Sequence, residues 1–222
     1  MKFLKKSMFL SFVTSLLCFL LSQISVASSV PVAQALQKLK LYGKKLEDKE
    51  YVNFEFQQEV YRASRKRTVK SSGRALFAKP NKFRWTFDKP GMGEWIFDGK
   101  MLFHHHAEQK KAKSYSLTSG HMHEFKRLVH MVLDTTQLLK EFELRSANEK
   151  SGLFSFFLVP YKKKNMDSLE LKYDHNQSYL KEVVMILNGG NTTTLFFSKP
   201  DFKPFSVSKF DLDKRVKIIK SL

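Results

Sequence analysis

The sequence predicts a mainly β (α+β) fold, in which one long antiparallel sheet curves into an open barrel covered by helices. Apolar and polar residues alternate in many short segments, as they do in strands with one buried face. Turn residues separate these segments at short intervals, which favours an antiparallel meander of about ten strands. Phe accounts for 21 of the 222 residues, so large aromatic side chains are available for the apolar face of the sheet.

The first 27 residues have the features of a secretory signal peptide. Three lysines precede a nearly uninterrupted apolar run from Met8 to Leu21, and small residues follow at Ser25-Val26-Ala27. The run is shorter than the ~20 residues of a membrane span, which favours a cleaved signal over an anchor. We therefore expect residues 28–222 to form a single domain. Cys18, the one cysteine, lies inside this signal, so the exported chain has no disulfide and no thiol nucleophile.

Residues 31–47 are expected to form an amphipathic helix. Apolar residues recur there at helical spacing, and Pro31 suits the first turn. Ser28 and Ser29 precede it and are expected to cap it. The apolar positions are Val32, Leu36, Leu39 and Leu46.

After residue 50 the period of the apolar pattern changes to two, which is typical of strands. Asp98-Gly99 predicts a two-residue hairpin loop between strands at 95–97 and 101–103. Asn188-Gly189-Gly190-Asn191 marks another reversal. The segment from Lys214 to Leu222 could add a terminal strand. The clearest alternating sets are Val52, Phe54 and Phe56; Phe83, Trp85 and Phe87; and Leu169, Leu171 and Tyr173.

A second amphipathic helix is expected from Met122 to Leu133, midway along the chain. Met122, Phe125, Val129 and Val132 share one helical face, and His123, Arg127, His130 and Asp134 share the opposite face. A curved sheet interrupted by such a helix has to lay it on its apolar face. Two interiors remain open at this point: aromatic side chains that fill the core, since β proteins pack densely, and a hollow beneath the helix.

Residues 72–103 carry a distinctive order of elements. A strand that begins with Gly73 is followed by a K-P-N-x-F-x-W segment, a turn containing proline, and a strand that ends in D-G-K-x-L-F. The residues concerned are Gly73, Lys79-Pro80-Asn81, Phe83, Trp85, Pro90, Asp98-Gly99-Lys100 and Leu102-Phe103. This pattern resembles that of the LolA family of periplasmic lipoprotein carriers, and the order of the elements outside the block is similar too.

The resemblance implies an open antiparallel half-barrel of eleven strands, with a helical lid over a hydrophobic cavity. It also implies a carrier without catalytic activity or cofactor, in the periplasm of a Gram-negative bacterium. Such a carrier takes acylated lipoproteins from an inner-membrane ABC transporter and passes them to an outer-membrane acceptor.

The expected cavity and lid residues are large and apolar, as a surface for acyl chains requires. Ordinary core packing is the alternative role for each of them. The expected wall of the lipid cavity is Phe54, Phe56, Phe83, Trp85, Trp95, Phe97 and Leu102, and the expected inner face of the lid is Met122, Phe125, Val129 and Val132.

Lys79 stands where family members usually have an arginine, which is thought to bond lid carbonyls and hold the empty carrier shut. Lysine keeps the charge but lacks the rigid fork of donors. We therefore expect Lys79 to act as a weaker lid latch. A solvated strand-end lysine is the alternative.

The remaining motifs predict neither catalysis nor a metal site. No G-x-x-x-x-G-K-[ST] or G-x-S-x-G segment occurs. His104 and His106 can share one face of a strand, but His105 cannot join them. H-E-x-x-H fails because position 127 is Arg.

The formal net charge is +18, and three basic runs, at 65–67, 110–111 and 162–164, fall where turns or strand ends are expected. Because we expect the chain to be exported from the cytoplasm, we do not expect nucleic acid as its partner. A positive surface suits anionic headgroups or acidic partner domains instead. We expect a monomer. Two other functions remain open from the residues: a periplasmic lipid-sensing regulatory domain, and a carrier of another lipid such as a glycolipid.

Overall fold

The computed structural model describes residues 28–88, 93–106, 108–162, 165–177, 179–198 and 200–220. The predicted signal peptide, residues 1–27, and Pro90 of the family pattern lie outside the described residues.

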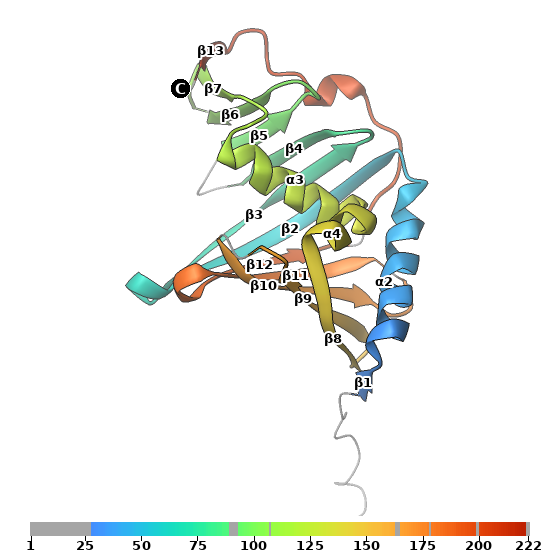
Figure 1. Ribbon diagram of the computed structural model, residues 1–222. Helices are drawn as coiled ribbons and strands as arrows, with labels where there is room; N and C mark the ends of the chain where they lie inside the picture. Colours follow the sequence, from blue (N-terminus) through green and yellow to red (C-terminus); the bar gives the residue numbers. More distant parts are fainter. Residues whose placement is uncertain are drawn as a thin grey trace, which may run out of the picture.

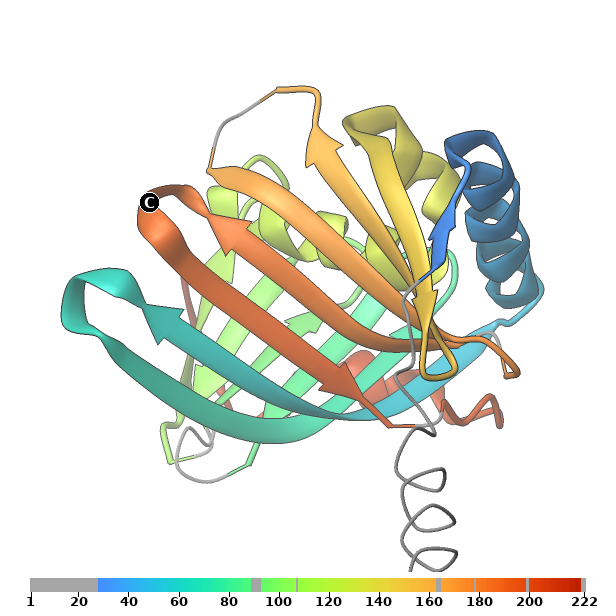
Figure 2. The ribbon, with the colours of Figure 1, turned by 90° about the horizontal axis from the view of Figure 1, so that it is seen from below.

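In the described part of the chain, thirteen strands form one curved sheet, with the order β1-β8-β9-β10-β11-β12-β2-β3-β4-β5-β6-β7-β13. Figures 1 and 2 show how this sheet bends around the helices. The strands are β1 (Ser28–Val30), β2 (Tyr51–Arg62), β3 (Arg67–Ala78), β4 (Lys82–Phe87), β5 (Gly93–Phe97), β6 (Leu102–His106), β7 (Lys111–Tyr115), β8 (Phe142–Lys150), β9 (Leu153–Pro160), β10 (Met166–Asp174), β11 (Leu180–Leu187), β12 (Asn191–Phe197) and β13 (Lys217–Lys220).

The sheet consists of two meanders, β2–β7 and β8–β12, which are joined where β12 pairs with β2. The eleven strands β2–β12 are antiparallel throughout, so the predicted half-barrel is confirmed. Two short strands extend it at its edges. β1 pairs with β8, and β13 pairs with β7 in parallel, which makes the sheet mixed rather than purely antiparallel.

Three α-helices, α2 (Val32–Glu47), α3 (Gly120–Leu133) and α4 (Thr135–Glu141), lie on the concave side of the sheet. α3 and α4 belong to the connection between β7 and β8, which lie near opposite edges of the sheet. This connection therefore has to cross the concave face, and Figure 1 shows α3 doing so. Short 3-10 turns cover Ala63–Arg65, Asn188–Gly190 and Val207–Phe210.

The start of α2 differs from the prediction. Ser28 and Ser29 do not cap the helix, because they pair with Glu149 and Asn148 as strand β1. Pro31 occupies the N-cap position without a side-chain cap. An edge strand satisfies more backbone groups than a serine cap would, which explains the difference.

Stacked tyrosines hold α2 against the sheet. The ring of Tyr42 lies 4.9 Å from that of Tyr173 on β10, at an interplanar angle of 26°, and meets Phe154 and Phe156 edge-on. Tyr173 is fully buried, and burial raises the pKa of its phenol well above the usual value, as it does less strongly for Tyr42. Both hydroxyls are buried without a hydrogen-bond partner in the described structure.

The loop between β5 and β6 is longer than predicted. Phe97 pairs with Leu102, so four residues rather than two form the loop. The carboxylate of Asp98 accepts bonds from the backbone N–H groups of Lys100 and Met101, at 2.7 and 2.8 Å. This local Asx turn replaces the expected two-residue turn. Gly99 still supplies the positive φ, +101°.

Gly73 on β3 lies close to the backbone of β4 and to a ring of β2. A Cβ at this position would overlap the Thr86 carbonyl oxygen and come too close to the ring of Phe56. Backbone cannot move away cheaply inside a paired sheet. The glycine that opens the family pattern is therefore required by space rather than by turn geometry.

We predict that Gly73→Ala lowers the free energy of unfolding by about 1–3 kcal/mol, because the added methyl overpacks the sheet. Urea denaturation of both proteins measures this change. Gly120→Ala is the matched control, since nothing lies within 4 Å of its Cβ position. Equal stability of the Gly73→Ala variant and the parent would show that the strands separate easily at this point.

Candidate functional site

Strand register brings the seven predicted wall residues onto the same, concave face. Phe83, Phe97 and Leu102 are cross-strand neighbours in one row. The next row contains Phe54, Ala75, Trp85 and Trp95, and Phe56 lies in the row after it, opposite Gly73. Every one of the seven is buried except Trp95, which is half-buried. The concave floor is therefore aromatic over β2 to β5.

The lid helix α3 lies on this floor. The ring of Phe125 stacks on that of Phe83 with centroids 4.7 Å apart and an interplanar angle of 22°, and lies 5.1 Å from Trp95. Met122 and Val132 are buried, while Phe125 and Val129 are half-buried. Ser119 caps the helix by accepting a bond from the N–H of Met122. The predicted inner face of the lid is the face that meets the sheet.

In the described part of the structure, two hollows adjoin the contact between Phe125 and Phe83. The first has a volume of about 790 Å³ and includes Phe83, Phe97, Met122 and Val129 in its lining. The second, of about 380 Å³, has more apolar than polar surface. It lies toward the end of the strands at which β2 turns into β3. We call it the mouth hollow. Its lining includes Trp85, Trp95, Phe125, Leu128, Met131, Met185 and Leu195.

The predicted wall residues thus divide into two groups. Phe83, Phe97, Trp85 and Trp95 line a hollow, whereas Phe54 and Leu102 pack in the core. Phe56 supports Trp85 from below, with ring centroids 4.3 Å apart. Sequence reasoning missed the opposite wall, which β11 and β12 supply. The alternation of Val183, Met185 and Leu187 is the signal that could have found it.

Lys79 lies beside the larger hollow, close to the lid. Its side chain lines that hollow together with Val129, His130 and Asp134, and its ammonium donates to the Leu46 carbonyl in the last turn of α2 at 3.4 Å. The lysine therefore bonds a helix C-terminus, where a cation is favourable. Its role as a lid latch stays a prediction.

Sequence reasoning also missed α4, which anchors the lid. Asp134 accepts a bond from the N–H of Gln137 and caps α4. This Asp-x-x-Gln spacing is a capping signal that could have predicted the helix. The Glu141 carboxylate at its end lies 3.6 Å from Arg127 and 3.5 Å from His130. The polar face of α3 is thus turned toward α4. Gly43 on α2 leaves room for Thr135 at the start of α4.

The three consecutive histidines alternate between the faces of β6 as expected. His104 stacks on Trp95 at 4.1 Å and adjoins His106. His105 is on the convex face, where its Nδ1 lies 3.0 Å from the Glu94 carboxylate. Among the described residues, no three His, Cys, Asp or Glu side chains lie close enough to hold a metal ion.

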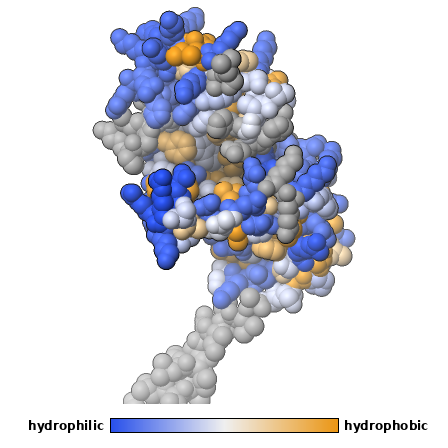
Figure 3. Space-filling view, turned by 60° about the vertical axis from the view of Figure 1, so that its left-hand side comes forward, coloured by the Kyte–Doolittle hydropathy of each residue, from blue (hydrophilic) through white to orange (hydrophobic). Residues whose placement is uncertain are grey.

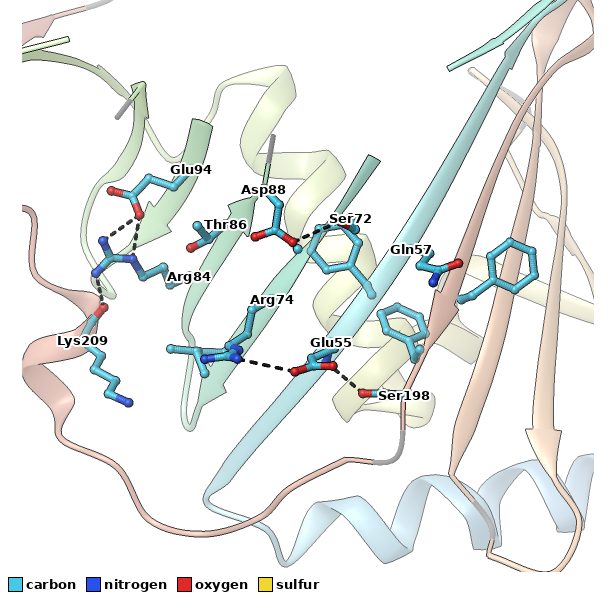
Figure 4. Close-up of a pocket in the computed structure, with 15 residues that line it drawn as sticks. Glu55, Gln57, Ser72, Arg74, Arg84, Thr86, Asp88, Glu94, Ser198 and Lys209 are labelled. Carbon is cyan, nitrogen blue, oxygen red and sulfur yellow. Dashed lines mark hydrogen bonds and ion pairs between the residues drawn. The ribbon is translucent and has the colours of Figure 1, made fainter. Parts of the chain in front are cut away.

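A groove of about 1010 Å³ lies on the convex face, between β2–β5 and the chain that follows β12 (Figure 4). Several of its polar side chains are paired with one another. Arg74 bonds Glu55 at 3.5 Å, Arg84 bonds Glu94 at 2.6 Å, and Arg84 also donates to the Lys209 carbonyl at 2.9 Å. The bond from Arg84 to Lys209 holds the C-terminal segment against the sheet, and the other two join neighbouring strands. Phe210 is buried there against Leu76 and Ala78. The lining of this groove is polar. It differs in this from the trough, the name we give to the aromatic concave floor together with the two hollows beneath α3.

None of the helices in the described part of the chain has the length and apolar character needed to cross a membrane.

Comparison with known proteins gives a family and a fold. A family model described as "Outer membrane lipoprotein carrier protein LolA" matches residues 48–213. An uncharacterized conserved protein from Thermus thermophilus has a similar structure, with a TM-score of 0.56 at 11% identity over 85% of this chain and 100% of that one. A LolA superfamily protein from Nitrosomonas europaea matches with a TM-score of 0.43 at 9% identity, over 80% and 97% of the two chains. No curated protein sequence matches significantly. Since the family model spans most of the sequence, including the whole sheet from β2 to β12, the chain belongs to the LolA family.

Proposed function

We propose that this protein is a periplasmic carrier that shelters the acyl chains of lipoproteins in its concave trough. On this proposal it receives them from an inner-membrane ABC transporter and delivers them to an outer-membrane acceptor, without catalysis. The observation that carries the proposal is the mouth hollow. It is a largely apolar space between the aromatic floor and α3, whose Phe125 ring packs on Phe83 and Trp95 over the middle of that floor.

The chemistry of the trough suits acyl chains. Each methylene that leaves water contributes about 0.8 kcal/mol, so a long chain needs apolar surface along its whole length. Trp85, Phe87, Met185 and Leu195 offer such surface around the mouth hollow, and Met185 adapts its shape easily. The family description, a lipoprotein carrier, agrees with this chemistry.

The contact between Phe125 and the floor lies between the two hollows, and movement of the lid supplies further room. Phe125 fills the space between Phe83 and Trp95 in this structure. If α3 lifts, its ring leaves the floor and the two hollows become one trough. Cargo that binds only the open form shifts the equilibrium toward it. The cost of opening also limits affinity, which lets the cargo leave.

We predict that Leu128→Glu reduces the amount of acylated cargo that co-purifies with the protein from periplasm. Leu128 is half-buried on α3 and lines the mouth hollow, so the substitution puts a carboxylate on its wall without burying it in the core. Leu41→Glu is the matched control, because Leu41 is 61% exposed on α2. Mass spectrometry of the bound species measures the cargo.

The same measurement decides between the functions left open by the sequence. Triacylated proteins bound to the parent and to Leu41→Glu, but not to Leu128→Glu, support the lipoprotein carrier. Free glycolipid identifies a carrier of another lipid. A parent protein that never carries lipid contradicts the proposal and favours a sensor.

We predict that Phe125→Ala binds an apolar fluorescent probe severalfold more tightly, although it lowers stability by about 2 kcal/mol. Removing the ring joins the two hollows without moving the helix. Probe titration and urea denaturation measure the two effects. Phe196→Ala, on the convex face and 37% exposed, should change neither. Unchanged or weaker probe binding by Phe125→Ala would mean that this ring does not occupy the binding space.

A further inference from the structure

The concave face of the sheet extends beyond the part that α3 covers. β2 and β3 continue beyond the mouth hollow as a hairpin that projects from the sheet (Figures 1 and 2). Gln58 lines the mouth hollow and accepts a bond from the Ser71 hydroxyl at 3.3 Å. The register then places Val60 opposite Val69, and Arg62 opposite Arg67. Because alternate residues share a face, these pairs extend the concave face by about 13 Å past Gln58.

This extension changes from apolar to basic along its length. Val69 is 45% exposed, although it continues the face that is buried farther inside. Five cations and one carboxylate occur between Glu59 and Lys70. Glu59 pairs with Lys70 at 2.6 Å. The remaining cations gather at the tip as Arg62, Arg65, Lys66 and Arg67, and no carboxylate of the described residues lies within ion-pair distance of them.

The loop between β9 and β10 lies at the same end of the sheet, and it also combines an exposed aromatic residue with a cation. Tyr161 is 61% exposed and is followed by the exposed Lys162. The backbone N–H of Tyr161 donates to the Glu141 carbonyl at the end of α4, at 3.0 Å. The β11–β12 turn stands between the two loops and contacts the hairpin, where Ala63 donates to the Asn191 side chain at 3.1 Å. Figure 3, with this end turned forward, shows hydrophilic and hydrophobic side chains side by side.

We propose that this end of the molecule docks on an anionic phospholipid bilayer. Exposed tyrosines and valine interleaved with arginine and lysine match the interface between headgroups and acyl chains, where aromatic rings sit and cations bind lipid phosphates. Tyr61, on the opposite face of the hairpin, is 38% exposed. An acidic protein partner would need only the cations and would give no role to Tyr61, Val69 and Tyr161. The inference rests on the proposed carrier function for its purpose. Docking places the mouth hollow against the membrane, so that an acyl chain passes along the Val60–Val69 face without crossing open water.

Flotation with lipid vesicles tests the docking. We expect the protein to bind vesicles of phosphatidylcholine mixed with phosphatidylglycerol and to ignore pure phosphatidylcholine, with binding that weakens as salt increases. The variant R62Q/R65Q/K66Q/R67Q should bind more weakly by about a hundredfold or more, since each cation near an anionic surface contributes about fivefold to the binding constant and four are removed.

The matched control removes the same charge elsewhere. K40Q/K44Q/K100Q/K150Q replaces four exposed lysines away from the hairpin, and it should bind within about twofold of the parent if location rather than net charge matters. Equal loss in both variants, or a parent protein that does not bind the anionic vesicles, overturns the proposal.

A second readout separates docking from cargo binding. The hairpin variant should take up an acyl probe as well as the parent does, because its substitutions lie outside the hollows. If the protein binds vesicles but carries no acylated cargo, docking is supported and only the carrier function is contradicted. Acylated cargo without vesicle binding leaves the carrier function intact and overturns docking.

Discussion

The rest of the structure depends on one topological constraint: the chain has to pass from β7, near one edge of the sheet, to β8, near the other. A curved sheet leaves its concave side open, and the shortest path lies across that side. The connecting segment is amphipathic, so it lays Met122, Phe125 and Val132 on the floor and turns Arg127 and His130 toward Glu141. The cover over the trough is therefore a connection that the strand order requires.

The sheet could be predicted largely from local patterns, while its N-terminal edge could not. The alternation around Phe54, Phe83 and Leu171 fixes which face of each strand is buried, and short turns fix the meander. A terminal strand within Lys214 to Leu222 is confirmed as β13. β1 has no such signal. Ser28 and Ser29 pair with Asn148 and its neighbours across more than a hundred residues, and this partner decides between strand and helix cap. Likewise, Asp98 forms an Asx turn that lengthens the β5–β6 loop.

For the candidate site, the sequence predicted which residues share the concave face, but not which of them line a hollow. Phe54, Phe56 and Leu102 are on the same face as Trp85, yet depth within the core separates them from the hollows, and depth follows from curvature rather than from periodicity. The wall formed by Met185 and Leu195 lies opposite because β12 pairs with β2, a contact between distant segments. The cis Lys79-Pro80 bond and the Leu46 partner of Lys79 were likewise beyond local patterns.

The central claim is that acyl chains occupy the space beneath α3. An amphiphile with a photoreactive group on its acyl chain tests it most directly, when crosslinked sites are mapped by mass spectrometry. The account predicts labels on residues around the mouth hollow, such as Trp85, Leu128, Met185 and Leu195, and on few others. Labels confined to the convex groove around Arg74 and Arg84, or scattered over the outer surface, would contradict it.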